Sequence, residues 1–120
     1  MTEDPRWLYR QMIDAMVVSC ATGQGQVSAR RVRVGVWNAN ADAIADVDPA
    51  QQAMNSLLGS LTEAQRDALA VLFAEEYASG MFNALEVLHA AQCAPFDRGY
   101  DGDPSDDFLG RMDGWTWPEE

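Results

Sequence analysis

Apolar residues recur every three to four positions in two stretches that each begin with Asp-Pro, which is the spacing of one helix face. Asp suits the N-cap and Pro the first helical turn, so Asp4-Pro5 and Asp48-Pro49 mark helix starts. Thr22-Gly23 closes the first pattern and Gly59 closes the second. We predict a first helix over about residues 5–21 and a shorter one after Asp48-Pro49. The apolar positions of the first helix are Leu8, Met12, Ile13, Met16, Val17 and Cys20.

The strongest helical pattern begins at a capping box formed by Thr62 and Gln65 and continues to about Ala91. An unbroken helix of about 30 residues would be about 45 Å long. That length is large for a chain of 120 residues. Because glycine weakens a helix, we predict a kink or break at Ser79-Gly80.

The segment between these helices shows a different period. Val32, Val34 and Val36 occupy alternate positions, which predicts a short strand near residues 31–37. No partner strand is apparent elsewhere, and an isolated strand cannot satisfy its own backbone, so the end of a second helix is the alternative. The expected fold class is mainly α: a compact bundle of about four helices with an irregular, packed C-terminal segment, in a single domain of residues 1–120.

The chain is strongly acidic, and its charge is unevenly distributed. The formal net charge is −11, from 8 arginines and 19 acids. Residues 1–40 hold five arginines and three acids, whereas residues 41–94 hold one arginine and eight acids. Such a surface repels nucleic-acid phosphates and attracts basic proteins. We expect the basic cluster at Arg30, Arg31 and Arg33 to pair with the acidic C-terminal segment.

The C-terminal segment, residues 95–120, combines eight carboxylates with five aromatic residues. Solvated acidic tails are usually poor in aromatic residues, so this segment is expected to fold back while presenting a negative face. Trp is enriched in interface hot spots, although at least one of Trp115 and Trp117 is expected to close the core. The predicted partner-binding residues are Tyr100, Asp101, Asp103, Asp106, Asp107 and Trp115.

Candidate catalytic and metal sites are weak. His89 and Cys93 stand four residues apart, but zinc needs at least three protein ligands and the chain holds one histidine. The acidic stretch from Asp101 to Asp107 resembles the start of a calcium loop, yet Met112 stands where the bidentate glutamate is required. We predict no cofactor, no metal and no enzymatic activity.

Targeting signals are also not apparent. The N-terminus is acidic and lacks the apolar region of a signal peptide. No apolar run approaches the length of a membrane span, which is about 18 residues. The expected location is the cytoplasm, with no membrane partner.

The run from Asp107 to Glu119 contains Asp-Phe, then Arg, Asp-Gly and Trp-Pro-Glu. This run resembles the closing motif of a family of small, largely helical, uncharacterised bacterial proteins. Residues 61–66 and 79–83 resemble that family's helix opening and its glycine-centred break, with Ser79 and Asn83 in place of Gly and Asp. The resemblance covers about the last 60 residues. Small acidic proteins of this kind are similar in character to immunity proteins of interbacterial toxins.

Together these features favour a non-enzymatic binding protein, an immunity protein or antitoxin that occludes the basic active site of a toxin domain. Two alternatives stay open. One is a DNA-mimic inhibitor of a nucleic-acid enzyme, and the other is a small metal-binding or hydrolytic protein that uses His89 and Cys93. A homodimer is also compatible with the sequence.

Overall fold

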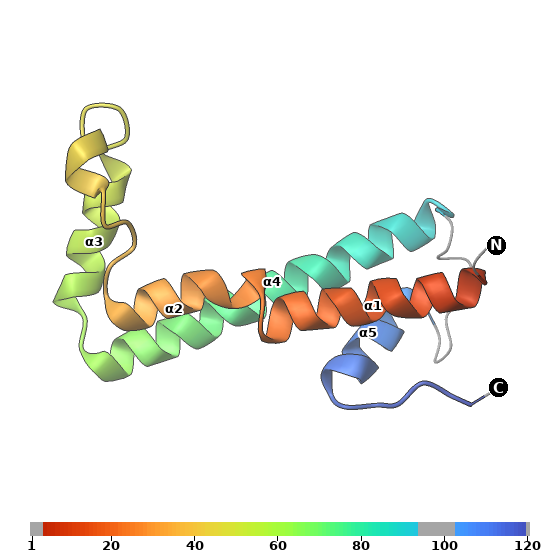
Figure 1. Cartoon of the computed structure of the whole chain (residues 1–120). Coiled ribbons are helices and arrows are strands. Elements are labelled where there is room, and N and C mark those ends of the chain that lie inside the picture. The colour runs from red at the N-terminus through yellow and green to blue at the C-terminus, as the bar shows by residue number, and fades with distance from the viewer. Residues whose placement is uncertain (1–3, 94–102, 120) are drawn as a thin grey trace.

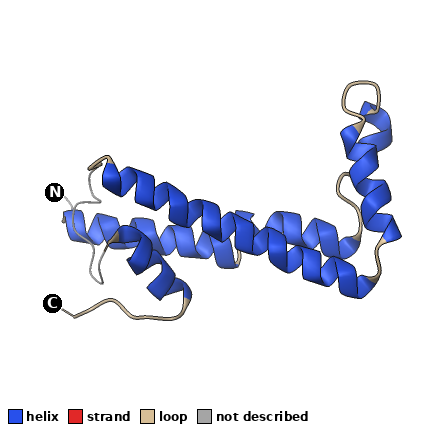
Figure 2. Cartoon of the chain, turned by 180° about the vertical axis from the view of Figure 1, so that it is seen from behind, coloured by secondary structure: helices blue, strands red, loops and turns tan. Residues whose placement is uncertain are grey.

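The computed structural model describes residues 4–93 and 103–119. The described residues form helices and connecting loops with no strand, which confirms the mainly α class (Figure 2). Among them, no helix has the length and apolar character needed to cross a bilayer. The elements are α1 (Pro5–Ala21), η1 (Gln24–Gln26), α2 (Val27–Val34), η2 (Ala41–Ile44), α3 (Ala50–Ser60), α4 (Glu63–Ala90) and α5 (Pro104–Met112).

The long helix α4 organises the molecule. Figure 1 shows α1 and α2 following one another along α4, with α5 packed beside α1 and α3 projecting from the opposite end. The principal extents are 53 × 31 × 27 Å and the radius of gyration is 18.5 Å. A rounded domain of this length would have a radius of gyration of about 14 Å. The elongated shape therefore divides the interior between two separate clusters.

One cluster lies between α1, α4 and α5, and the other lies where α2, α3 and α4 meet. The buried residues of the first are Tyr9, Ile13, Cys20, Leu85 and Phe108. Those of the second are Ala29, Val32, Leu58 and Ala70. The second cluster is built from smaller side chains, so it buries less apolar surface and contributes less to stability.

Helix α4 is continuous for 28 residues, so the predicted break at Ser79-Gly80 is wrong. The capping box is present, because Thr62 accepts from the Gln65 amide and Gln65 accepts from the Thr62 amide. Gly80 is exposed and faces open space, so it disturbs no packing. Contacts with α1, α2 and α5 support the helix on both sides of this glycine.

The strand predicted near residues 31–37 is also wrong, and the alternative of a second helix is confirmed by α2. Val32 is fully buried, whereas Val34 is 73% exposed, so the alternating valines do not share one buried face. Gly35 ends the helix in the left-handed region, at φ 87°, and its N–H bonds the carbonyls of Arg31 and Val32. The period of two in the sequence thus combines one buried valine, Val32, with the exposed Val34 and Val36, and does not indicate a sheet.

The arginines of α2 do not pair with the described part of the C-terminal segment as expected. Arg33 lies 3.9 Å from Asp67 of α4. The guanidinium of Arg31 lies 5.5 Å from the centre of the Trp37 ring. The reason is geometric, because α2 packs on α4 while α5 packs on α1 and α4.

Candidate functional site

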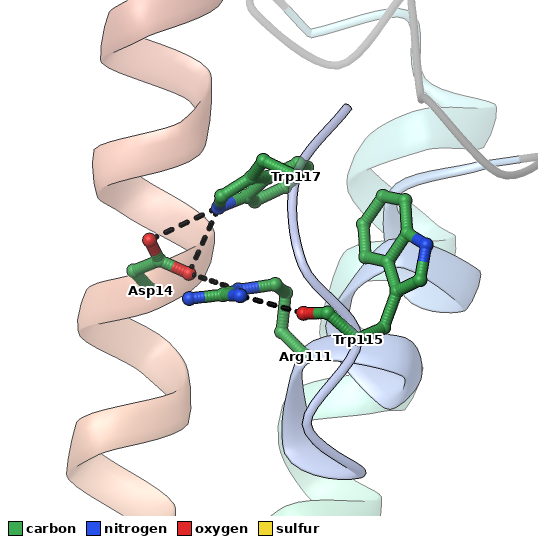
Figure 3. Close-up of polar contacts among 4 residues, drawn as sticks. All are labelled: Asp14, Arg111, Trp115 and Trp117. Atoms are coloured by element: carbon green, nitrogen blue, oxygen red, sulfur yellow. Dashed lines mark hydrogen bonds and ion pairs between the residues drawn. The ribbon is translucent and has the colours of Figure 1, made fainter. Parts of the chain in front are cut away.

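The C-terminal tail is held against α1 by one carboxylate, that of Asp14 (Figure 3). Arg111 Nε donates to Asp14 Oδ1 at 2.7 Å, and Trp117 Nε1 donates to Asp14 Oδ2 at 3.0 Å. Arg111 Nη1 donates to the carbonyl of Trp115 at 2.6 Å. Charge-assisted bonds of this kind are stronger than neutral ones. We call this group of four residues, Asp14, Arg111, Trp115 and Trp117, the C-terminal clasp.

Ring contacts extend the clasp. Trp117 makes edge contacts with Trp115 and Tyr9, at centroid distances of 5.2 and 6.0 Å. The guanidiniums of Arg10 and Arg111 lie 5.4 and 5.6 Å from the Trp117 ring centre. Arg10 also donates to the carbonyl of Pro118 at 2.9 Å. The expectation that at least one tryptophan closes the core agrees with the position of Trp117.

Trp115 was predicted as a partner anchor, but it is half-buried within the clasp. Its ring lies over Gly110, where an added Cβ would meet the ring at 3.4 Å. The Trp115 amide donates to the Gly110 carbonyl at 2.8 Å, and this bond closes the turn after α5. Trp115 therefore fixes the turn that connects α5 to the C-terminal tail.

Asp107 was predicted to steer a partner, but its side chain lies in the interior with no exposed surface. It accepts a hydrogen bond from the hydroxyl of Tyr9, which is only 2% exposed. Because a fully buried carboxylate cannot contact a partner, we correct this prediction and assign Asp107 to the packing of α5 on α1.

Asp103 and Asp106 lie at the start of α5. Asp103 is the N-cap and accepts from the Asp106 amide at 3.0 Å. The Ser105 hydroxyl and then the Asp106 amide lower the pKa of Asp103 below its ordinary value of 3.8, with a smaller contribution from nearby His89. Asp106 is exposed and so keeps the location that steering requires. Tyr100 and Asp101 lie outside the described residues.

A groove of about 620 Å³ runs between α4 and α5. Its α5 side is formed by Leu109 and Met112, which are 46% and 37% exposed. Carboxylates stand on both sides, Glu75 from α4 and Asp113 after α5. We call it the α4–α5 groove; the described lining residues are Glu75, Ala78, Ser79, Phe82, Asn83, Phe108, Leu109, Met112 and Asp113.

Among the described residues, Cys20, Cys93 and His89 do not form a common site. Cys20 is buried near the end of α1, and this burial raises the pKa of its thiol. His89 lies in the last turn of α4, and Cys93 follows the helix and packs on the first core cluster. Within residues 4–93 and 103–119, no three His, Cys, Asp or Glu side chains are grouped to hold a metal ion.

Sequence reasoning missed Asp14, Tyr9 and the groove. Asp14 was hidden because it directly follows the core residue Ile13 and resembles an ordinary surface position of an amphipathic helix. The available signal was the C-terminal motif itself, since its arginine and its indole N–H both need a partner when buried. Only the tertiary fold shows that this partner lies 97 residues earlier in the chain.

One family model matches this chain over residues 2–119, and its description is a family of unknown function (DUF6547). The chain therefore belongs to that family. The match covers both halves, beyond the last 60 residues that carry the resemblance described above. No curated protein and no solved structure matches the chain.

Proposed function

We propose that this member of the family of unknown function is a non-enzymatic acidic binding protein that holds a basic protein partner at the α4–α5 groove. The observation that carries the proposal is the combination of exposed apolar side chains with carboxylates from two helices. Interfaces commonly pair an apolar centre with a polar rim in this way.

The charge around the groove supports a basic partner. Asp106, Leu109 and Asp113 are spaced by three and four residues, so they share one face of α5 and its end. The arginine of this helix, Arg111, is directed to Asp14 on α1 instead. The described groove lining contains two carboxylates and no basic residue. A negative surface of this kind accelerates association with a positive one.

The shape of the groove supports contact with protruding side chains. Its volume lies within the range of sites that accept small ligands or a few side chains. Met112 can adjust to different partner shapes because its side chain is flexible and polarizable. Leu109 is 46% exposed, and a bound partner would shield this apolar surface from water. A lysine or arginine of the partner would then meet Glu75 or Asp113.

The finer proposal is that the partner is a bacterial toxin domain and that this chain is its immunity protein or antitoxin in the cytoplasm. Toxins that act on nucleic acids or phosphorylated substrates need basic active sites, which an acidic protein can occlude. The clasp supports this role because it fixes α5, and a preorganised surface loses less entropy on binding. The proposed binding surface differs from the one predicted from the sequence: it keeps Asp106 and adds Glu75, Leu109 and Asp113.

The test is capture of partners from the source cell with wild-type bait, washed at low and then high salt and identified by mass spectrometry. We expect one stoichiometric basic protein whose retention falls with salt. Asp113→Arg and Leu109→Ala should each weaken its binding at least about tenfold, the former mainly through the association rate.

The matched controls are Glu63→Arg and Val87→Ala, because both positions are exposed on α4 and outside the groove lining. The controls should bind as wild type. Equal weakening by groove and control variants would contradict the assignment to the α4–α5 groove. Release of the partner by duplex DNA would instead favour the DNA-mimic alternative, in which the carboxylates replace phosphates.

A further inference from the structure

The end of the molecule opposite the clasp carries an apolar hollow. Helix α3 projects from the α2–α4 pair and contacts it mainly near its own base, where Leu58 is buried (Figure 1). A hollow of about 200 Å³ lies at this corner. We call it the elbow; it is lined by Val32, Trp37, Met54, Leu57, Leu58, Leu69 and Phe73.

Large apolar side chains remain exposed around the elbow. Met54 and Leu57 of α3 are 39% and 56% exposed. On α4, Leu72 and Phe73 are 56% and 38% exposed. Exposed apolar side chains gathered beside an apolar hollow are typical of an interaction site in a folded protein. The elongated shape, with a radius of gyration of 18.5 Å, leaves these side chains uncovered by their own chain.

The distribution of charged residues indicates which partner covers the elbow. In a chain of net charge −11, residues 49–62 contain no charged side chain. Two copies of this chain repel each other over most of their surfaces, but this repulsion is weakest at α3. A basic partner would find no carboxylate on α3 itself to attract it. Helix α3, which we call the arm, is therefore suited to contact with a second copy.

Charged residues of opposite sign lie outside the arm, near its two ends. The exposed Asp42 and Asp46 belong to the segment before α3, which Figure 1 shows at the free end of the arm. The exposed Arg30 and Arg31 belong to α2, which lies beside the base of the arm. A pocket of about 490 Å³ is lined by these two arginines and extends to Gln51 in the first turn of α3. A two-fold axis pairs the same surface of both copies. Antiparallel arms would thus bring Asp42 and Asp46 of each copy toward the other copy's arginines.

We infer that this protein forms a two-fold homodimer in which the α3 arms pack antiparallel, each covering the elbow of the other copy. Met54 and Leu57 of one copy approach Leu72 and Phe73 of the other. This contact is separate from the α4–α5 groove, so the dimer leaves both grooves available.

The test is analytical ultracentrifugation of the full chain over a concentration series. Wild type should sediment at twice its mass of 13.2 kDa. Leu57→Asp should raise the dimer dissociation constant at least about 30-fold, because it places a charge in an apolar contact. Val87→Asp is the matched control, since Val87 is an equally apolar helical position, 68% exposed, near the far end of α4. This control should remain dimeric.

A charge exchange tests the antiparallel arrangement. Arg30→Glu should weaken the dimer about three- to tenfold at low salt, and adding Asp46→Arg to the same chain should restore it. Circular dichroism would verify that every variant keeps its helical content. A monomeric wild type, or a folded Leu57→Asp variant that dimerises as wild type, would overturn the homodimer. An unaffected Arg30→Glu dimer would overturn the antiparallel arrangement.

Discussion

The two ends of the molecule complete their packing by different means. At the clasp end, Tyr9, Asp107 and Phe108 are buried, and α5 covers one face of α1. At the elbow end, the buried residues are small, and Leu57 and Leu72 of α3 and α4 stay more than half exposed. The clasp end therefore buries large side chains under its own C-terminal segment and leaves Leu109 and Met112 exposed in the α4–α5 groove, whereas the elbow end buries smaller ones.

Because of this difference, substitutions at the two ends should affect different properties: the stability of the single chain at one end and its association at the other. Residues of the clasp end should change the free energy of unfolding of a single chain, because their contacts are intramolecular. Exposed residues of the elbow should change that free energy little and change association more, since their contacts are made only on binding. The comparison can be tested with substitutions at both ends.

Phe108→Ala should give the largest effect, because Phe108 is fully buried in the cluster that α1, α4 and α5 form. We expect a loss of about 3–5 kcal/mol in the free energy of unfolding, measured by urea denaturation. Leu109→Ala, at the adjacent and 46% exposed position, should lose less than about 1 kcal/mol. Similar losses for the two variants would break the comparison by showing that the clasp end is loosely packed.

Two ion pairs, one at each end of the molecule, extend the comparison. Arg111 and Asp14 have side chains 26% and 32% exposed and lie 2.7 Å apart, whereas Arg33 and Asp67 are 45% and 58% exposed and lie 3.9 Å apart. Arg111→Ala should cost about 1.5–3 kcal/mol, and Arg33→Ala less than about 0.5 kcal/mol. A double-mutant cycle with Asp14→Ala, followed by thermal and urea unfolding, would isolate the pair. Zero coupling there would show that Arg111 acts through its other contacts, the Trp115 carbonyl and the Trp117 ring.

At the elbow end, Asn55 should matter most among the polar side chains. Its Oδ1 accepts from the amides of Trp37 and Asn38 at 2.7 and 3.1 Å, and its Nδ2 donates to the Asn38 carbonyl at 2.8 Å. Asn55→Ala should cost about 1–2 kcal/mol of unfolding free energy by urea titration. Asn40→Ala, at an exposed loop position, should have little effect. Equal effects would mean that Asn55 does not fix the base of the arm.

Local signals in the sequence were enough to predict most helix starts, but they did not predict the tertiary contacts. Asp4 and Thr62 act as the caps that the sequence predicts, because capping is decided within a few residues. The alternating valines of α2 led to the wrong prediction of a strand, because the exposure of each valine is set by the helices that pack on α2. Asp107 and Trp115 were assigned to the surface for the same reason. No local pattern shows that Tyr9 lies against Asp107, or that Asp14 lies against Arg111 and Trp117.

The smallest expected effect concerns Asp103, whose carboxylate has a pKa below its ordinary value of 3.8. A lowered native pKa means that the unfolded chain binds the proton more readily. The contribution of Asp103 is therefore full above about pH 4 and is lost as the pH falls through the native pKa. Asp103→Asn keeps an N-cap acceptor but cannot titrate, so at pH 7 it should be within about 1 kcal/mol of wild type.

Urea denaturation from about pH 2.5 to 6 would reveal the difference between wild type and Asp103→Asn. We expect the two stability curves to be separated near pH 6 and to converge in acid, because only wild type loses the Asp103 contribution there. Curves that stay parallel across this range would show that the bonds from Ser105 and the Asp106 amide do not favour the ionised carboxylate. The cap would then stabilise α5 equally in both protonation states, and the clasp end would owe its acid sensitivity to other carboxylates.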